Sequence, residues 1–197
     1  ATYPRTKALA ECMVLGANGT DGLLTCALRP HLIWGPGYNH LVPRIVGRAK
    51  AGKLRLVGGG TNLVDHVYVD NAADAHLAAA DRLAPGSAVA GKAYFVTNGE
   101  PLPIAELIGR ILEAAGLPRE RRSVSPAVAY AAGTVAEVVF KALKIESEPR
   151  MTRFLARQLS CAHWYDISAA RRDLGYEPAV STEEGMRRLA TSLRGSA

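Results

Sequence analysis

Apolar residues recur every three or four positions in many stretches of this chain, a spacing that predicts helices. These stretches are 4–16, 41–51, 70–83, 103–115, 126–143, 151–158, 167–174 and 182–193. Short apolar or alternating runs between them predict strands at 23–28, 54–57, 64–69 and 93–96. Because helices and short strands alternate along the chain, the pattern predicts an α/β fold with a parallel sheet.

Residues that interrupt this pattern predict where elements begin and end. Arg29 and Pro30 end the first strand, and Asp70 is placed to cap the helix that follows residues 64–69. The glycine cluster Gly58–Gly60 precedes a predicted strand rather than a helix, so we interpret it as a tight turn and not as a phosphate-binding loop. No GxGxxG pattern follows a strand near the beginning of the sequence.

Composition and charge narrow the possible partners. The chain has 197 residues, of which 48% are hydrophobic, and 24 Lys and Arg against 18 Asp and Glu give a net charge of +6. The basic residues are scattered without interleaved aromatics, so we expect no nucleic-acid partner. Cys12, Cys26 and Cys161 form no CxxC or metal-ligand spacing, which favours a reduced, cytoplasmic protein without a metal. The most apolar window, 124–143, contains Glu137 and Lys141, so we expect no integral membrane segment.

Tyr3 and Lys7 form the first candidate for chemistry. They are four residues apart at the start of a predicted helix, so their side chains lie on one helix face. An ammonium group beside a phenol favours the phenolate form. A tyrosine tuned in this way can take a proton from a hydroxyl group as hydride leaves the carbon, or donate one in the reverse reaction.

The order of motifs along the chain carries a resemblance to a known family. The successive stretches are residues 3–11 (YPRTKALAE), 28–37 (LRPHLIWGPG), 57–62 (VGGGTN), 65–76 (DHVYVDNAADAH), 91–98 (GKAYFVTN) and 173–178 (DLGYEP). This succession resembles the carboxyl-terminal part of extended short-chain dehydrogenases, and in particular the 3β-hydroxysteroid dehydrogenase and sterol-4-carboxylate 3-dehydrogenase branch. The resemblance implies part of a Rossmann-type doubly wound parallel sheet with a small, mostly helical substrate lobe. It places residues 1–37 in the dinucleotide-binding domain and 38–197 mainly in the substrate lobe, with 64–84 returning to the sheet.

The resemblance also implies roles for individual residues. Tyr3 would be the acid/base, and Lys7 would assist it and hold the nicotinamide ribose. Residues Pro30, His31 and Leu32 would contact the nicotinamide end of NAD or NADP, with NAD slightly favoured. Residues Tyr38, Asn39 and His40 follow at the opening toward a small apolar hydroxy or keto substrate.

Two features of the family pattern lie upstream of its tyrosine: the glycine fingerprint, and the serine or threonine that binds the substrate oxygen. Neither is in this sequence. We therefore expect these 197 residues alone to be inactive and to bind the cofactor weakly, because no helix N-terminus is prepared for the pyrophosphate.

Two other functions remain open on the sequence. One is a nucleotide-sugar epimerase or dehydratase, which would use the same Tyr–Lys pair; the Ala- and Val-rich stretch 124–143 suits an apolar ligand better. The other is a non-catalytic fragment that serves as an assembly module.

The helix predicted at 4–16 is apolar around much of its circumference, with Met13 and Val14 adding to its apolar stripe. In the family that the chain resembles, this helix commonly contacts a second subunit. We therefore expect a homodimer with Met13 or Val14 near its interface.

Overall fold

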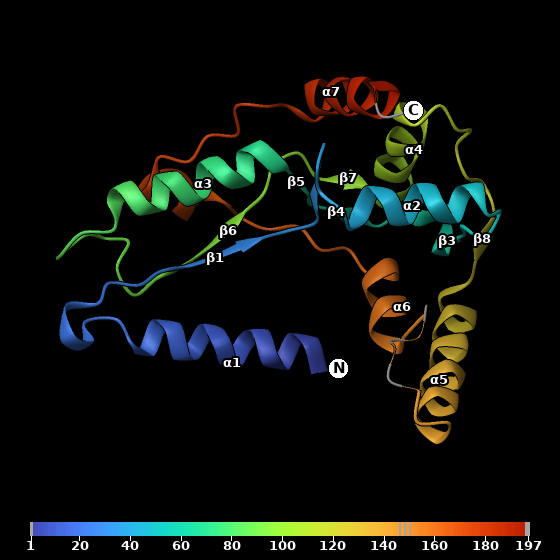
Figure 1. The fold of residues 1–197 in the computed structure, drawn as a ribbon, viewed down its shortest axis with the longest axis horizontal. Coiled ribbons are helices and arrows are strands. Elements are labelled where there is room, and N and C mark those ends of the chain that lie inside the picture. Colours follow the sequence, from blue (N-terminus) through green and yellow to red (C-terminus); the bar gives the residue numbers. More distant parts are fainter. Residues whose placement is uncertain (1, 146, 148, 150, 196–197) are drawn as a thin grey trace. The chain divides into compact units, whose positions relative to one another are not determined.

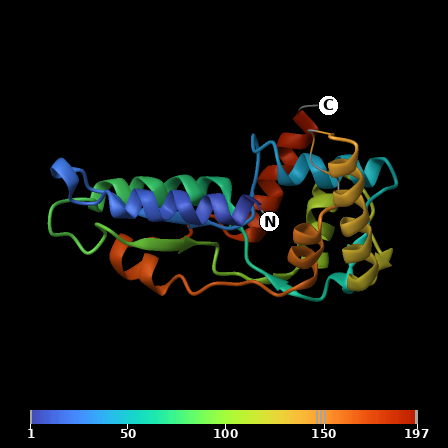
Figure 2. The ribbon, with the colours of Figure 1, turned by 90° about the horizontal axis from the view of Figure 1, so that it is seen from below.

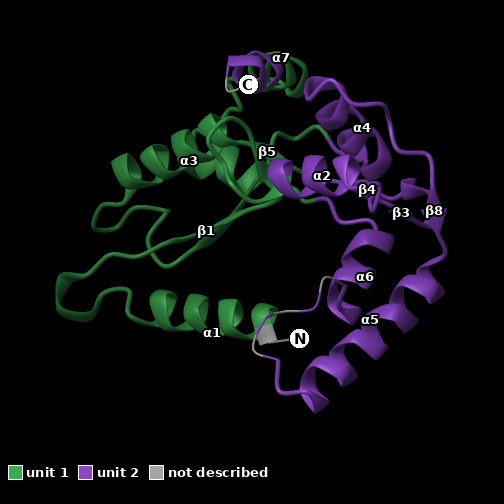
Figure 3. Cartoon of the chain, turned by 45° about the vertical axis from the view of Figure 1, so that its right-hand side comes forward, with its two compact units in different colours: residues 1–41, 65–100, 165–189 green, residues 42–64, 101–164, 190–197 purple. Residues whose placement is uncertain are grey.

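A computed structural model describes residues 2–145, 147, 149 and 151–195. The chain divides into two compact units (Figure 3). Unit 1 comprises residues 1–41, 65–100 and 165–189, and unit 2 comprises residues 42–64, 101–164 and 190–197.

Both units combine helices with short strands (Figure 1). The α-helices are α1 (Thr2–Gly16), α2 (Leu41–Lys50), α3 (Val69–Arg82), α4 (Ile104–Ala114), α5 (Pro126–Ala142), α6 (Arg153–Ser160) and α7 (Thr182–Gly195). The strands are β1 (Ala27–Pro30), β2 (Ile33–Trp34), β3 (Leu56–Val57), β4 (Leu63–Val64), β5 (Val67–Tyr68), β6 (Ala93–Val96), β7 (Leu102–Pro103) and β8 (Ser123–Val124). Two 3₁₀ turns, η1 (Thr20–Gly22) and η2 (Gly58–Gly60), and one π-helical turn, η3 (Ala170–Leu174), complete the described elements.

Unit 1 is built around parallel strand pairs. β1 pairs with β6, from Ala27 opposite Ala93 to Pro30 opposite Val96, and β2 pairs with β5. α3 runs beside β6 (Figure 1) and turns a face of alanines, Ala72, Ala75 and Ala79, into the core. Small side chains on this face let the helix approach the strands closely enough to bury the larger residues Tyr94, Val96, Leu174 and Tyr176.

The first strand differs from the prediction at both ends. β1 begins at Ala27 rather than Leu23 and includes Arg29 and Pro30, which were expected to end it. The backbone N–H of Thr25 donates to the side chain of Asn18 at 2.9 Å, so the loop rather than a neighbouring strand binds this part of the chain. Pro30 fits at the last position of the strand, where its missing N–H costs no hydrogen bond within the ladder.

The expected cap of α3 is also wrong. The helix begins at Val69 after Tyr68, with no side-chain cap, so Asp70 lies inside its first turn. The carboxylate of Asp70 instead lies 3.3 Å from a guanidinium nitrogen of Arg188. An acidic residue in a first helical turn still interacts favourably with the positive end of the helix dipole.

Unit 2 contains α4, α5, α6 and nearly all of α2. α4 buries one apolar face, including Leu107, Ile111 and Leu112. α5 starts with Ser125, whose hydroxyl accepts from the N–H of Val128 at 3.2 Å, and it lies side by side with α6 (Figure 2). Two further strand pairs belong to this unit, the parallel pair β3–β8 and the antiparallel pair β4–β7.

The predicted α/β class with parallel strands is confirmed. The expected division into a dinucleotide-binding part and a substrate lobe stays a prediction, and the compact units follow other boundaries: residues 85–100 and 165–189 fold with unit 1. Within the described residues, no helix has both the length and the apolar character needed to cross a membrane.

Candidate active site

Tyr3 and Lys7 lie on the first turns of α1, where the structure brings their side chains together. The ammonium nitrogen of Lys7 is 6.0 Å from the centre of the Tyr3 ring, and 62% of Tyr3 is exposed. The phenol is thus accessible to a ligand and has a cation beside it. The Thr6 hydroxyl donates to the Tyr3 carbonyl at 2.9 Å, which helps to order this exposed helix start.

α1 is tied to the strand that carries the next candidate residues. Arg29 on β1 donates two hydrogen bonds to the carboxylate of Glu11, from Nε at 2.6 Å and from a terminal nitrogen at 2.5 Å. These bonds lower the pKa of Glu11 and raise that of Arg29, so both groups stay charged at neutral pH. The hydroxyl of Thr25 also donates to the Val14 carbonyl at 2.9 Å.

Residues Pro30, His31 and Leu32 form the carboxyl end of β1 and the turn that follows it. The His31 N–H donates to the Val96 carbonyl at 3.2 Å, and the Leu32 carbonyl accepts from the Val67 N–H at 3.4 Å. Leu32 has φ +43°, in the left-handed region that a leucine rarely adopts. Such strain persists only where the surrounding structure imposes it, and it is often found at ligand-binding turns.

An aromatic cluster beside His31 was missed by the sequence reasoning. The ring of Tyr165 stacks on Phe95, with centres 4.1 Å apart, and makes a T-shaped contact with the His31 ring, with centres 5.0 Å apart. The backbone N–H of Tyr165 donates at 2.8 Å to the buried carboxylate of Asp65. Burial, with the Asp65 charge adding to it, raises the pKa of Tyr165, so its phenol is neutral at physiological pH. The parallel pairing of β1 and β6 could have indicated that Phe95 lies near His31. No sequence pattern around Tyr165 indicates its contacts.

The third group follows the loop Gly35–Gly37. The rings of Tyr38 and His40 lie 5.4 Å apart in a tilted arrangement, and Asn39 between them is exposed. Gly35 has φ +143°, and a Cβ there would lie 2.6 Å from a methyl carbon of Val69. Glycine is therefore required at the start of this loop.

The candidate residues thus form three groups in unit 1, on α1, on the turn after β1 and in the loop after Gly37. Among the described residues, no hydrogen bond or ring contact joins Tyr3 or Lys7 to Tyr38 or His40. The roles assigned to all three groups stay predictions.

The chemistry of these groups fits one end of a nicotinamide dinucleotide. A phenol and an ammonium on one accessible helix face are donors suited to ribose hydroxyls. The pyrophosphate has no comparable place in the described residues. Gly58–Gly60 forms the turn η2, as predicted, and a Cβ at Gly60 would lie 2.8 Å from the Cβ of Ala105, so this glycine serves close packing.

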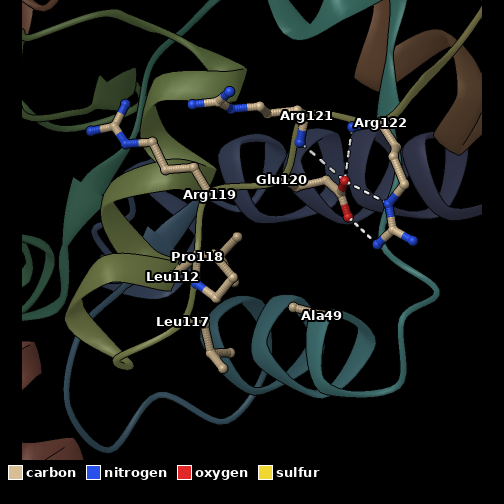
Figure 4. Close-up of a pocket in the computed structure, with 8 residues that line it drawn as sticks. All are labelled: Ala49, Leu112, Leu117, Pro118, Arg119, Glu120, Arg121 and Arg122. Atoms are coloured by element: carbon tan, nitrogen blue, oxygen red, sulfur yellow. Dashed lines mark hydrogen bonds and ion pairs between the residues drawn. The ribbon is translucent and has the colours of Figure 1, made fainter.

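A pocket in unit 2 contains none of the candidate residues. It has a volume of about 300 Å³ and lies between α2 and the segment after α4, lined by Ala49, Leu112, Leu117, Pro118, Arg119, Glu120, Arg121 and Arg122 (Figure 4). Glu120 accepts hydrogen bonds from the side chain of Arg122 and from two backbone N–H groups, so part of the positive charge at this pocket is already neutralised. No group of metal ligands occurs among the residues that the structure describes.

Comparison with known proteins decides the family. The profile of the 3-beta hydroxysteroid dehydrogenase/isomerase family matches residues 1–126. The chain belongs to this family. A 2-alkyl-3-oxoalkanoate reductase from Stenotrophomonas maltophilia is 55% identical over 98% of the chain and 58% of its own length. A 3beta-hydroxysteroid-dehydrogenase/decarboxylase (isoform 2) from Arabidopsis thaliana is 39% identical over 97% of the chain and 35% of its own length.

Solved structures support the fold of this 3-beta hydroxysteroid dehydrogenase/isomerase family member. DesIV, a dTDP-glucose 4,6-dehydratase from Streptomyces venezuelae solved as a double mutant with NAD bound, superposes with a TM-score of 0.67. It is 22% identical over 98% of this chain and 50% of its own, so the likeness concerns the Rossmann-type fold alone. The resemblance inferred from the sequence motifs is thereby confirmed at the level of family and fold.

Proposed function

We propose that these residues belong to an NAD- or NADP-dependent oxidoreductase that interconverts a secondary alcohol and a ketone on an apolar substrate. The observation that carries the proposal is the Tyr3–Lys7 contact on an accessible turn of α1, in a member of a dehydrogenase family. The chain spans 58% of the length of the S. maltophilia relative, so the proposal concerns the natural gene product.

Tyr3 acts on the substrate oxygen. In the reductive direction its hydroxyl donates a proton to the oxygen of the ketone, and in the oxidative direction its phenolate accepts a proton from the alcohol. The Lys7 ammonium, 6.0 Å from the ring centre, stabilises the negative charge that develops on the phenolate oxygen.

The nicotinamide, when bound, supplies or accepts the hydride. Tyr3 and Lys7 would hold its ribose hydroxyls, and the strained turn Pro30–Leu32 would contact its ring end through backbone groups. Tyr38, Asn39 and His40 would face the substrate.

The names of the relatives suggest which substrates to test. The relatives from S. maltophilia and Shewanella oneidensis, 55% and 50% identical, are both called 2-alkyl-3-oxoalkanoate reductases. The names of these reductases and of the steroid dehydrogenases share an oxygen function on carbon 3 of a largely hydrocarbon molecule. We therefore propose a 2-alkyl-3-oxoalkanoate as the first substrate to test and a 3β-hydroxysteroid as the second.

The test is Tyr3→Phe in the natural gene product, with consumption of reduced nicotinamide as the readout. Turnover should fall by about two to four orders of magnitude, the usual weight of a positioned acid/base, while the melting temperature changes little. Tyr130→Phe, at another exposed tyrosine, is the matched control and should keep normal turnover. Near-normal turnover of Tyr3→Phe would refute the assignment.

A second substitution separates the two roles of the lysine. Lys7→Met should both lower turnover and raise the KM for the cofactor, because one ammonium serves the phenolate and the ribose. Lys50→Met, at an exposed position of α2, is the control. If Lys7→Met lowered turnover without raising the KM for the cofactor, the proposed contact between Lys7 and the ribose would be refuted.

We also propose a homodimer that uses α1. Met13 is 75% exposed and Val14 is 45% exposed, which leaves an apolar surface on this helix. Sedimentation of the natural gene product should show a dimer that Met13→Glu dissociates, whereas a concentrated monomer insensitive to that change would contradict the proposal.

A further inference from the structure

The turn at residues 30–32 is held by aromatic rings as well as by backbone hydrogen bonds. The ring of His31 makes a T-shaped contact with the ring of Tyr165, and Tyr165 stacks on Phe95 with the two ring planes 15° apart. Leu32, the next residue along the chain, has φ +43°. A backbone conformation that a leucine rarely adopts is imposed by its surroundings. The rings hold the turn at the residue next to this strained position.

Tyr165 is itself fixed by contacts on both its backbone and its ring. Its N–H donates at 2.8 Å to a carboxylate oxygen of Asp65, and Asp65 is 1% exposed. Its ring stacks on Phe95, which belongs to β6 and lies in register with Arg29 on β1. Stacked and T-shaped pairs are the favoured geometries of aromatic rings. Tyr165 is therefore an anchored support against which His31 packs.

The same set of contacts continues from Phe95 to the helix that carries Tyr3 and Lys7. The guanidinium of Arg29 lies 5.0 Å from the centre of the Phe95 ring and donates two hydrogen bonds to Glu11 on α1. Positions 3, 7 and 11 are spaced by four residues, so they lie along one side of the helix. The bonds to Arg29 therefore turn the side of α1 that carries Tyr3 and Lys7 toward β1.

The lengths of the two elements bring the candidate groups to the same end of this pair. α1 and β1 run in opposite directions (Figure 1). Tyr3 precedes Glu11 by eight residues, which is about 12 Å along the helix axis. Leu32 follows Arg29 by three residues, which is about 10 Å along the strand. Both steps start at one ion pair and lead in the same direction, so the contacts of Arg29 relate the position of Tyr3 to that of the turn.

We propose that Tyr165 is a positioning residue for the nicotinamide. Its ring supports His31 and thereby keeps the backbone groups of residues 30–32 in place beside the nicotinamide ring. This inference rests on the proposed oxidoreductase function and deepens the role given there to the turn. The ring rather than the hydroxyl has this role, because no hydrogen bond of the Tyr165 hydroxyl occurs in the described part of the chain.

Positioning of this kind affects the cofactor and the hydride step more than the ketone. A turn without its support contacts the nicotinamide less firmly, so cofactor affinity falls. The nicotinamide also departs from the geometry that hydride transfer needs, and a displacement of about 1 Å can lower a rate about 100-fold. The ketone is bound by other groups, so its KM should change little.

The experiment compares Tyr165→Leu with Tyr165→Phe in the natural gene product. Fluorescence of the reduced nicotinamide measures the binding of NADH and NADPH without turnover. Tyr165→Leu removes both ring contacts and should raise the dissociation constant about tenfold. It should also lower turnover about tenfold or more and increase the deuterium isotope effect measured with deuterated cofactor, because hydride transfer becomes slower. Tyr165→Phe keeps both ring contacts and should give the values of the unchanged protein.

A second position keeps the test independent of the folding of one variant. His31→Leu removes the same ring contact from the other side and should weaken cofactor binding to a similar extent. The double variant should be no weaker than the worse of the two, because both substitutions remove one shared contact. Tyr130→Leu is the matched control, since Tyr130 is a 40% exposed tyrosine on α5, outside these contacts, and it should bind the cofactor normally.

Three results would overturn the inference: unchanged cofactor affinity in a folded Tyr165→Leu variant, loss of turnover in Tyr165→Phe, or effects of Tyr165→Leu and His31→Leu that multiply in the double variant. Circular dichroism establishes folding. If the unchanged protein bound neither NADH nor NADPH, the proposed function itself would fail. If the unchanged protein and Tyr165→Leu bound the cofactor equally, only the positioning role would be refuted.

Discussion

The two units are stabilised in different ways. Among the described residues, the buried polar or charged residues all belong to unit 1: Asp65, His66, Asn71, Thr97, Asn98 and Thr182. Unit 2 has apolar residues such as Leu107 and Ile111 in its interior. Three of its acidic side chains form ion pairs nearer the surface: Glu106 and Glu113 pair with Arg119, and Glu137 pairs with Arg153.

The buried polar side chains of unit 1 hold distant backbone segments in register. Asn71 on α3 donates to the Val180 carbonyl at 2.7 Å and accepts from the Val180 N–H at 2.9 Å. Its amide also donates to Asn98 at 2.8 Å, and Asn98 accepts from the Tyr68 N–H at 3.0 Å. Hydrogen bonds are directional, so this network specifies backbone positions that apolar packing alone would leave less well defined.

Near the candidate site, a buried hydrogen bond likewise fixes the positions of two aromatic side chains. The indole N–H of Trp34 donates to Nδ1 of His66 at 3.1 Å, and both side chains are fully buried. Trp34 follows the strained turn at Leu32 by two residues. The unit that carries the candidate catalytic residues is thus the one whose buried side chains form this directional network, which suits a site that needs fixed geometry.

Asn71→Ala is the substitution for which we expect the largest loss in the free energy of unfolding. It removes three hydrogen bonds and leaves the buried N–H of Val180 without its partner, so the free energy of unfolding should fall by about 3 kcal/mol. The Val180 carbonyl and the Asn98 side chain each keep one other bond, from the Asn98 amide and from the Tyr68 N–H. Denaturant unfolding measures it. Asn39→Ala, at an exposed asparagine, should stay within about 0.5 kcal/mol. A loss below about 1 kcal/mol for Asn71→Ala would mean that the network contributes little.

Gly133→Ala tests the packing of unit 2. The added Cβ would lie 2.6 Å from the carbonyl carbon and 2.8 Å from the next amide nitrogen of the Thr152–Arg153 backbone, which forces α5 and α6 apart. We expect a loss of about 1–3 kcal/mol in the free energy of unfolding. Gly47→Ala in α2 is the matched control, because a Cβ there meets nothing within 4 Å. It should stabilise by up to about 1 kcal/mol through helix propensity, and equal losses in both variants would contradict the packing explanation.

Glu106→Gln has the smallest expected effect and tests the surface pairs of unit 2. Hydrogen bonds from Arg119 and Arg110 lower the pKa of Glu106 from 4.5 to about 2. A carboxyl group whose pKa is lowered in the folded state stabilises the fold at pH values above its unfolded-state pKa. This contribution disappears as the pH falls through the folded-state pKa. The difference between the unchanged protein and the variant should therefore be below about 1 kcal/mol at pH 6.

That difference should shrink between about pH 4.5 and pH 2. Thermal melts across this range provide the measurement. A difference that stays constant down to pH 2 would show that the charge on Glu106 does not contribute.

Much of the helical structure could be predicted from the order of residues because its signals are local. The stretch expected at 126–143 is α5 (Pro126–Ala142), and Ser125 and Pro126 mark its start by their own chemistry. The strand expected at 93–96 is β6 with the same bounds. The Tyr3–Lys7 proximity follows in the same way, since a spacing of four residues in a helix brings two side chains together whatever the rest of the chain does.

Only the tertiary structure could assign the elements and contacts that depend on partners far along the chain. β2, β7 and β8 have two residues each and exist because another strand pairs with them, so no periodicity reveals them. Tyr165 reaches His31 and Phe95 across more than 60 residues, and the bond from its N–H to Asp65 spans 100. Asp70 resembles a cap in the sequence but contacts Arg188, 118 residues away. The pattern within one segment reflects only the backbone preferences of that segment. Contacts between distant side chains depend on how all segments pack together in the core, so only the tertiary structure determines them.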